Sequence, residues 1–258
     1  YLAVMSVLIE SWDAVAAGYD RYWVPRFHPW IRHTVAAPGV LPPGPIAVPC
    51  CGTGAELVLL AQRYPEREIV GFDLSPGMVA VARAQVSGRV TARVADASRL
   101  PGTWAGVVSC FGLQQLPDPP AALASWCAAL RPGGRLAVAL WTADIHDDGP
   151  FDALRITSNR LLGASDQTWN ARLGPAVQAS AELCSDDLVQ ATIHHDSPEA
   201  FWRGMVAEGP WQARARRHPE VTAALEAEFL ATWPPGPLSH TPHARIIVAQ
   251  APLRSGAG

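Results

Sequence analysis

The stretch Ile46-Ala47-Val48-Pro49-Cys50-Cys51-Gly52-Thr53-Gly54 decides the fold of this chain. Its apolar first half is typical of a buried strand, and two glycines follow at the end of it. Glycine lets the backbone turn sharply and approach a ligand closely before a helix begins. The next residues, Ala55–Tyr64, carry apolar side chains on one face, which predicts that helix. The pattern predicts a strand–turn–helix unit, with or without a ligand over the turn.

The same alternation continues along the chain. Further strands are predicted at Glu68–Leu74, Arg89–Ala95, Ala105–Phe111 and Arg135–Trp141, with helices at Pro76–Val86 and Pro120–Leu130 and a turn at Arg131–Gly134. Strands that alternate with helices of this length favour a parallel, doubly wound sheet. Upstream, Ser11–Ala37 has a helical pattern that Pro25 and Pro29 are expected to break or kink.

The pattern changes after Trp141. Residues 144–185 are interpreted as an insertion, followed by a strand at Val189–His195, helices at Pro198–Glu208 and Pro219–Ala231, and a last strand at Ala244–Ala251. Because the last strand comes so late in the chain, we expect the segments before it to be cap elements that are inserted between two strands of a single sheet.

Composition excludes several functional classes. Of 258 residues, 49% are hydrophobic and 17% charged, enough for a large core, and the net charge of -3 gives no basic footprint for nucleic acid. All the cationic side chains other than histidine are arginine, which excludes lysine-based chemistry. Glu10 and Asp13 interrupt the apolar N-terminal run, so neither a signal peptide nor a membrane span is expected.

The five cysteines include no CxxC pair. An odd number of this kind fits neither a disulfide framework nor a zinc ribbon. We therefore expect buried thiols, a cytoplasmic location and no metal.

Asp73 sharpens the prediction of a ligand. It lies nineteen positions after Gly54, at the end of the next predicted strand. A carboxylate there can accept hydrogen bonds from both hydroxyls of an adenosine ribose. The alternative is a helix cap or an exposed turn acid.

These motifs together resemble the class I S-adenosylmethionine-dependent methyltransferases, in the branch with small-molecule acceptors. The resemblance covers about residues 10–142 and the terminal strand, and rests on Pro49–Gly54, Gly71-Phe72-Asp73-Leu74-Ser75-Pro76-Gly77-Met78, Val94-Ala95-Asp96-Ala97 and Leu130-Arg131-Pro132-Gly133-Gly134-Arg135-Leu136. It implies a Rossmann-like α/β fold with a doubly wound, seven-stranded, mostly parallel sheet and a helical lid or cap. The cofactor would be S-adenosylmethionine, with S-adenosylhomocysteine as product.

The resemblance also implies roles for individual residues. The methionine part of the cofactor would lie on the turn formed by Cys50, Cys51, Gly52, Thr53 and Gly54. The ribose would bind Asp73, and the adenine would contact Leu74, Met78, Asp96 and Ala97. The methyl-bearing end would be lined by Phe111 and Gly112. Tyr19 would close over the amino-acid end, unless its helix only packs on the sheet.

One departure from the family is clear. Relatives carry an acidic residue and a further glycine where this chain has Val48 and Cys50. The missing acid often orders the loop or meets the ammonium group of the cofactor. Three consequences are open: another group binds the ammonium, the affinity for the cofactor is weaker, or the protein has lost methyl transfer.

The catalytic residues are less constrained by the sequence. Methyl transfer needs alignment and desolvation of the acceptor, with a general base only for a protonated nucleophile. Candidate bases are His28, His194 and His195, and a surface or capping role is the alternative for each. His28 is favoured because it lies in the predicted lid, near Trp23, Phe27 and Trp30 in the sequence. Gln115 occupies a position where relatives often carry histidine. Ten tryptophans suit an aromatic or apolar acceptor, and equally suit core packing.

We therefore expect one methyltransferase domain over 1–258, with a lid (1–40), a cofactor-binding core (41–142), a cap (143–243) and a terminal strand (244–252). Its function would be methylation of a small molecule in secondary-metabolite biosynthesis. Neither nucleic acid nor membrane is expected as a partner, and the cap would cover a pocket or form a homodimer contact. The alternatives are an S-adenosylmethionine-binding enzyme that catalyses a cyclisation or rearrangement, and a non-catalytic partner subunit.

Overall fold

The computed structural model describes residues 2–142, 149–163 and 166–253. The chain divides into two compact units. The sheet unit comprises Pro29–Thr142, Gln167–Val189 and Ala244–Gly258, and the helical unit comprises Tyr1–His28, Ala143–Asp166 and Gln190–His243. Each unit is described by itself below.

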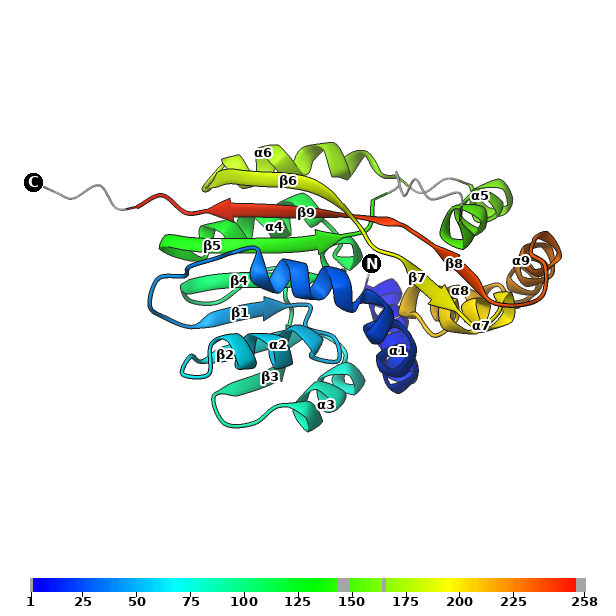
Figure 1. Cartoon of the computed structure of the whole chain (residues 1–258), viewed down its shortest axis with the longest axis horizontal. Helices are drawn as coiled ribbons and strands as arrows, with labels where there is room; N and C mark the ends of the chain where they lie inside the picture. Colours follow the sequence, from blue (N-terminus) through cyan, green and yellow to red (C-terminus); the bar gives the residue numbers. More distant parts are fainter. Residues whose placement is uncertain (1, 143–148, 164–165, 254–258) are drawn as a thin grey trace, which may run out of the picture. The chain divides into compact units, whose positions relative to one another are not determined.

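A seven-stranded sheet forms the sheet unit, in the order β3-β2-β1-β4-β5-β9-β6. Figure 1 shows these strands one above another, from β6 to β3. The strands are β1 (Ile46–Pro49), β2 (Ile69–Asp73), β3 (Val90–Val94), β4 (Trp104–Cys110), β5 (Leu130–Leu140), β6 (Glu182–Gln190) and β9 (His243–Gln250). The first five pair in parallel, and β9 pairs antiparallel with β5. The predicted Rossmann-like, mostly parallel sheet is therefore confirmed.

Helices connect β1 to β2, β2 to β3 and β4 to β5, as the alternating pattern predicted, whereas β3 leads to β4 without a helix. They are α2 (Ala55–Arg63), α3 (Pro76–Gln85) and α4 (Pro119–Ala128) with the 3₁₀ turn η1 (Leu113–Gln115) before it; α6 (Leu173–Gln178) and the 3₁₀ turn η2 (Thr168–Arg172) lie between β5 and β6. The starts of α3 and α4 follow from local sequence. Ser75 and Asp118 accept hydrogen bonds from main-chain N–H groups three residues on, and proline follows each cap.

The predicted turn at Arg131–Gly134 lies inside β5 as an irregularity. Trp104 and Gly106 of β4 face Leu130 and Arg135 of β5, so β5 contains three extra residues between these pairs. Gly133 has φ +71°, a left-handed conformation that glycine adopts without strain.

Helix α1 (Leu2–Ala36) corrects the expected break at Pro25 and Pro29, because helical structure continues through both prolines. The physical reason is that large side chains before Pro25 and after Pro29 are fully buried. Trp23 and Trp30 are 0% exposed, and their indole N–H groups donate to Gly204 O in the helical unit and Val189 O in the sheet unit, both at 2.7 Å. Packing of this extent exceeds the few kcal/mol that a proline costs inside a helix. The boundary between the units nevertheless falls immediately before Pro29.

The helical unit surrounds an aromatic core. Besides the first part of α1 it contains α5 (Pro150–Leu162), α7 (Pro198–Met205), α8 (Gly209–Arg217), α9 (Pro219–Thr232), β7 (Ile193–His195) and β8 (Leu238–His240). Helix α9 packs on α5, α7 and α8. Trp23 stacks on Phe27 and Phe151, with ring centroids 5.0 and 5.7 Å apart, and Phe201 stacks on Phe229. Trp23 and Phe201 therefore pack in the core of this unit.

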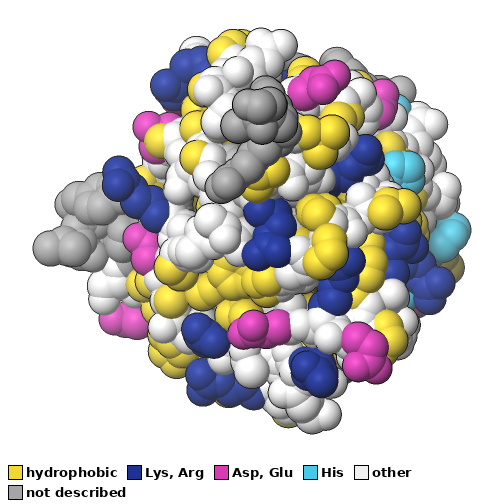
Figure 2. All heavy atoms as spheres, turned by 90° about the vertical axis from the view of Figure 1, so that its left-hand side faces the viewer, with side chains coloured by type: hydrophobic (Ala, Val, Ile, Leu, Met, Phe, Trp, Pro, Cys, Tyr) yellow, Lys and Arg dark blue, Asp and Glu magenta, His cyan; other side chains and the backbone are white. Residues whose placement is uncertain are grey.

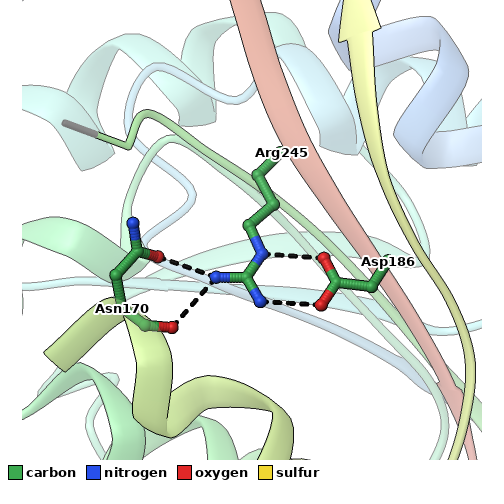
Figure 3. A network of polar contacts seen from close by, with 3 residues as sticks. All are labelled: Asn170, Asp186 and Arg245. Atoms are coloured by element: carbon green, nitrogen blue, oxygen red, sulfur yellow. Dashed lines mark hydrogen bonds and ion pairs between the residues drawn. The ribbon is translucent and has the colours of Figure 1, made fainter. Parts of the chain in front are cut away.

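Strand β6 is held to the sheet by a polar clamp (Figure 3). Arg245 of β9 donates through Nε and Nη2 to the two carboxylate oxygens of Asp186, both at 2.7 Å. Its Nη1 donates to the main-chain and side-chain oxygens of Asn170. One guanidinium therefore joins β9, β6 and η2.

The structure differs from the predicted segment boundaries in three places. Residues 29–40 of the predicted lid belong to the sheet unit, because the end of α1 packs there. Gln167–Val189 of the predicted cap also belong to the sheet unit, because β6 joins the sheet. The predicted strand Val189–His195 is divided between the end of β6 and β7. Residues 144–148 and 164–165 of the predicted insertion lie outside the described residues.

Over the described ranges, no helix combines the length and apolar character needed to cross a membrane. In the same ranges, no three His, Cys, Asp or Glu side chains gather as a metal site. Four of the five free cysteines are buried or half-buried, but Cys184 on β6 is exposed, which corrects the expectation that all are buried. On the face drawn in Figure 2, arginine and acidic side chains are interspersed, without a basic stripe.

Candidate functional site

The candidate site lies in the sheet unit, at the carboxyl ends of β1 and β4. Strand order changes direction between these two strands, since the chain proceeds outward from β1 to β3 and then returns to β4 on the other side. Ligands of open α/β sheets bind outside the carboxyl ends of the strands at such a switch point. The glycine turn follows β1, and Phe111 and Gly112 follow β4.

Asp73, at the end of β2, fixes the glycine turn. Its Oδ2 accepts a hydrogen bond from Gly52 N–H at 2.9 Å, and its Oδ1 accepts one from Ser75 N–H at 2.9 Å. Each carboxylate oxygen has a second lone pair, so the same group can also accept a hydrogen bond from a ligand hydroxyl. The side chain is half-buried, and a β-carbon at Gly52 would meet no atom within 4 Å. A ribose with two hydroxyl groups fits an acceptor of this kind beside an open glycine turn.

Two non-glycine residues at the site adopt left-handed backbone conformations. Cys50 has φ +54° and follows β1, and Phe111 has φ +60° and follows β4. Such conformations cost about 1–2 kcal/mol each and often occur at functional sites. The segments that contain them lie in close contact, because Gly112 follows Phe111 and a β-carbon on Gly112 would lie 2.2 Å from Cys50 Cβ. The cysteine side chain thus occupies the space that any other residue at 112 would need.

Two further glycines keep the turn close to its surroundings. Gly54 has φ +93°, and a β-carbon on it would lie 3.0 Å from Ala82 Cβ of α3. A β-carbon on Gly71 would lie 2.7 Å from Cys51 Sγ. The turn is therefore packed on β2 and α3 in a way that fixes its shape.

Glu56 is a site residue that the sequence interpretation missed. It is the second residue of α2, is 5% exposed, and accepts a hydrogen bond from Cys110 N–H at 3.0 Å. Burial raises the pKa of its carboxyl to about 7, against the lowering effect of hydrogen bonds from its own main chain and from Cys110, and the charge of Asp73 adds to the rise. The signal was available, because an acid one helical turn before Leu60 lies on the apolar face of α2.

The cysteines at the site are not reactive thiols. Burial, followed by the negative charges of Asp73 and Glu56, raises the pKa of Cys50 and of Cys51 well above the ordinary value. Burial and Glu56 act in the same direction on Cys110. A thiol must ionise to act as a nucleophile, so these side chains serve packing rather than chemistry.

The residues predicted to contact adenine lie around the ends of β2 and β3. Met78 is 3% exposed, and its N–H donates to Ser75 Oγ. Asp96 is exposed and accepts from Ser98 N–H at 2.8 Å, while Ala97 O accepts from the buried Trp126 indole at 2.7 Å. Leu74 is half-buried. Their roles toward adenine stay predictions.

Aromatic rings adjoin the end of β4. Phe111 stacks on Trp141 with centroids 4.6 Å apart, and Trp30 meets both rings edge-on. Gln115 ends η1 and is half-buried. Its neighbour Gln114, also absent from the sequence prediction, has a buried Oε1 without a hydrogen-bond partner among the described residues.

The other predicted residues lie in the helical unit. Tyr19 packs edge-on against Trp12 with centroids 5.3 Å apart, and His28 is half-buried near the end of that part of α1. Their placement relative to the glycine turn is not described, so the lid and general-base roles stay predictions.

His195, by contrast, is not suited to be a base. Its Nδ1 is 2.7 Å from Tyr22 Oη and its Nε2 is 3.1 Å from His240 Nε2. The ring is 2% exposed, and burial, aided by His240, lowers its pKa to about 3. His194, on the same strand, is exposed.

Comparisons with known proteins agree with this geometry. A family model described as "Methyltransferase domain" matches residues 46–134. Trans-aconitate 2-methyltransferase from Methylobacterium nodulans is 32% identical over 87% of this chain and 88% of that enzyme. Demethylmenaquinone methyltransferase from Beutenbergia cavernae is 31% identical over 75% of this chain and 77% of that enzyme. Trans-aconitate 2-methyltransferase from Deinococcus radiodurans is 36% identical, but the match spans only 48% of this chain and 44% of that enzyme.

Proposed function

Because the chain belongs to the class I S-adenosylmethionine-dependent methyltransferases, we propose that it methylates a carboxylate oxygen of a small organic acid. When bound, S-adenosylmethionine supplies a methyl group on a sulfonium and leaves as neutral S-adenosylhomocysteine once the acceptor oxygen has taken the methyl. The observation that carries the cofactor site is the Asp73 carboxylate, which holds the glycine turn beside it.

The residues of the sheet unit would divide the work of binding. Asp73 would accept the ribose hydroxyls, and the turn from Cys50 to Gly54 would hold the methionine part. Phe111 and Gly112 would line the methyl-bearing end. The hydrogen bonds of Asp73 and the packing of Gly112 on Cys50 fix these groups before a ligand arrives, which lowers the entropic cost of binding.

The organic-acid acceptor rests on two observations. The Methylobacterium relative, whose name gives trans-aconitate as substrate, matches over 87% of this chain and so extends beyond the sheet unit. A carboxylate is also ionised at neutral pH and needs no general base. This suits a chain in which His195 is buried and engaged at both ring nitrogens.

A quinone-related acceptor is the second candidate, because the Beutenbergia relative is named for demethylmenaquinone. Methyl transfer to a ring carbon requires loss of a proton, and His28 would then be the base to test. The predicted role in secondary metabolism concerns the same choice of acceptor and stays a prediction.

The test begins with calorimetric titration of the protein with S-adenosylmethionine. Asp73→Ala should weaken binding by at least about 100-fold, since hydrogen bonds to a charged group contribute about 1.5–3 kcal/mol each. Glu66→Ala, an exposed acid in the same unit, is the control. Failure of the wild-type protein to bind would refute the proposal.

Product analysis then decides the reaction. Incubation with trans-aconitate or a quinone-related acceptor should release S-adenosylhomocysteine with one of them. Conversion of an acceptor without that release would instead support the cyclisation or rearrangement alternative, and tight binding without any turnover would support a non-catalytic subunit.

A further inference from the structure

The sheet unit contains a buried carboxyl that the proposed binding roles do not use. Glu56 is the second residue of α2, two positions after the glycine turn ends at Gly54, and it is only 5% exposed. Its hydrogen-bond donors are neutral, namely main-chain N–H groups and the Cys110 thiol. Among the described residues, no arginine or histidine forms an ion pair with it.

Among the described residues, the titratable groups that interact with Glu56 through charge or hydrogen bonds are Asp73 and three cysteines, and none of them is cationic. Asp73 lies on β2, Cys110 ends β4, and Cys50 and Cys51 are the first two residues of the glycine turn. Thr34 of α1 hydrogen-bonds the same Cys110 thiol and carries no charge. A buried carboxylate without a cation is costly, so a proton or a cationic ligand is needed to balance it.

The cofactor of the proposed function provides such a cation. S-adenosylmethionine carries positive charge on its ammonium and sulfonium groups, both at its methionine end. In this chain Val48, at the position where relatives have an acid, is 0% exposed in β1 and carries no charge. Glu56 reaches the same strand ends from α2, through its hydrogen bond to the last residue of β4.

We propose that Glu56 is the counter-charge for the cationic methionine end of the cofactor, and that it releases its proton when the cofactor binds. The inference rests on the proposed function. The step breaks only the O–H bond of the carboxyl: the proton passes to water, the electron pair stays on the oxygen, and the carboxylate then balances the charge of the ligand cation. With a pKa of about 7 before binding, the carboxyl is half protonated at pH 7, so complete ionisation would release about 0.5 proton.

Calorimetry in two buffers of different ionisation enthalpy measures this proton directly. At pH 7 the wild-type protein should release about 0.5 proton more with S-adenosylmethionine than Glu56→Gln does. Glutamine keeps an acceptor for Cys110 N–H and removes the charge. The amino group of the ligand titrates with both proteins, so the difference isolates Glu56. The variant should also bind S-adenosylmethionine about 10- to 100-fold more weakly.

A second ligand separates this role from a structural one. 5′-Methylthioadenosine contains the adenosine and a neutral thioether, and lacks the amino-acid end. Its Kd should be the same for wild type and Glu56→Gln, and its binding should release no proton from Glu56. Glu66→Gln, an exposed acid in the same unit, should behave as wild type with both ligands.

The outcomes are distinguishable. Equal proton release by wild type with both ligands would overturn the inference while the proposed function stands, as would unchanged affinity of Glu56→Gln for S-adenosylmethionine. If wild type binds neither compound, the proposed function fails and the inference fails with it. Should Glu56→Gln not fold, the sign of proton exchange on wild type still decides the proposal. Binding of the ligand amino group as ammonium takes protons up, so net release with S-adenosylmethionine would support the role of Glu56, and net uptake would overturn it.

Discussion

Replacement of Gly112 by alanine should disrupt the end of β4, because the new side chain would clash with one residue, Cys50. The added β-carbon would lie 2.2 Å from Cys50 Cβ, 3.2 Å from Cys50 Sγ and 3.3 Å from Cys50 O. Carbon atoms in contact are about 3.5–4.0 Å apart, so the two segments must separate by more than an ångström. Hydrogen bonds from Phe111 N–H to Ala139 O and from Cys51 N–H to Phe72 O oppose that movement.

The magnitude follows from the cost of overpacking. Gly112→Ala should lower the free energy of unfolding by about 3 kcal/mol, the upper part of the range for inserted methyl groups. For a chain of this size, that corresponds to a fall of about 6–12 °C in Tm. Cys50→Gly alone should change stability by less than about 1 kcal/mol, because relief of a left-handed cysteine at φ +54° offsets the lost packing.

The double variant tests the cause. Cys50→Gly should restore most of the stability lost in Gly112→Ala, which gives a coupling free energy of about 2 kcal/mol in urea denaturation followed by circular dichroism. Gly88→Ala is the control, since φ is +66° there and a new β-carbon meets nothing within 4 Å. If the two effects simply add, or if Gly112→Ala is no less stable than Gly88→Ala, the assigned clash is wrong.

Two further predictions concern pH and the edge of the sheet. Burial lowers the pKa of His195 to about 3, so between about pH 6.5 and pH 3 the unfolded chain binds a proton at this residue that the folded chain does not. The stability that the neutral, buried ring contributes is therefore complete above pH 6.5 and is lost as the pH falls toward 3. Urea denaturation from pH 7.5 to 4.5 should show wild type losing up to about 1.4 kcal/mol per pH unit more than His195→Gln, and parallel pH profiles would contradict this. Arg245→Ala should destabilise the protein by about 1–2 kcal/mol, because its bidentate, partly buried ion pair with Asp186 is lost. As a control, removal of the exposed Arg155–Asp152 pair should cost no more than about 0.5 kcal/mol. Equal losses in thermal denaturation would argue against the clamp.

The sequence predicted the sheet unit because its signals are local. Most of the parallel strands are short apolar runs followed by a turn and a helix, although β3 leads to β4 without one. The predicted ends of these strands lie within one residue of those observed, except that β5 begins five residues earlier than predicted. The glycine turn and Asp73 were found for the same reason, since a tight turn requires glycine and the acid follows at a fixed spacing. The hydrogen bond between them was beyond sequence reasoning, because it joins residues 21 positions apart.

Glu56 shows where pattern reasoning stopped. Its helix was predicted correctly, but the acid was counted only as part of that helix. The change in its pKa comes from burial under other elements and from the neighbouring Asp73, which are properties of the folded chain.

The sequence by itself determined the alternation of strands and helices and the position of the glycine turn after β1, because backbone preference and hydrophobic period act over a few residues. Only the tertiary structure decided that α1 continues through Pro25 and Pro29, that Gly112 must lie against Cys50, and that His195 is buried between Tyr22 and His240. Those outcomes depend on contacts between residues far apart in the chain, where the free energy of burial outweighs the local preference of any one residue.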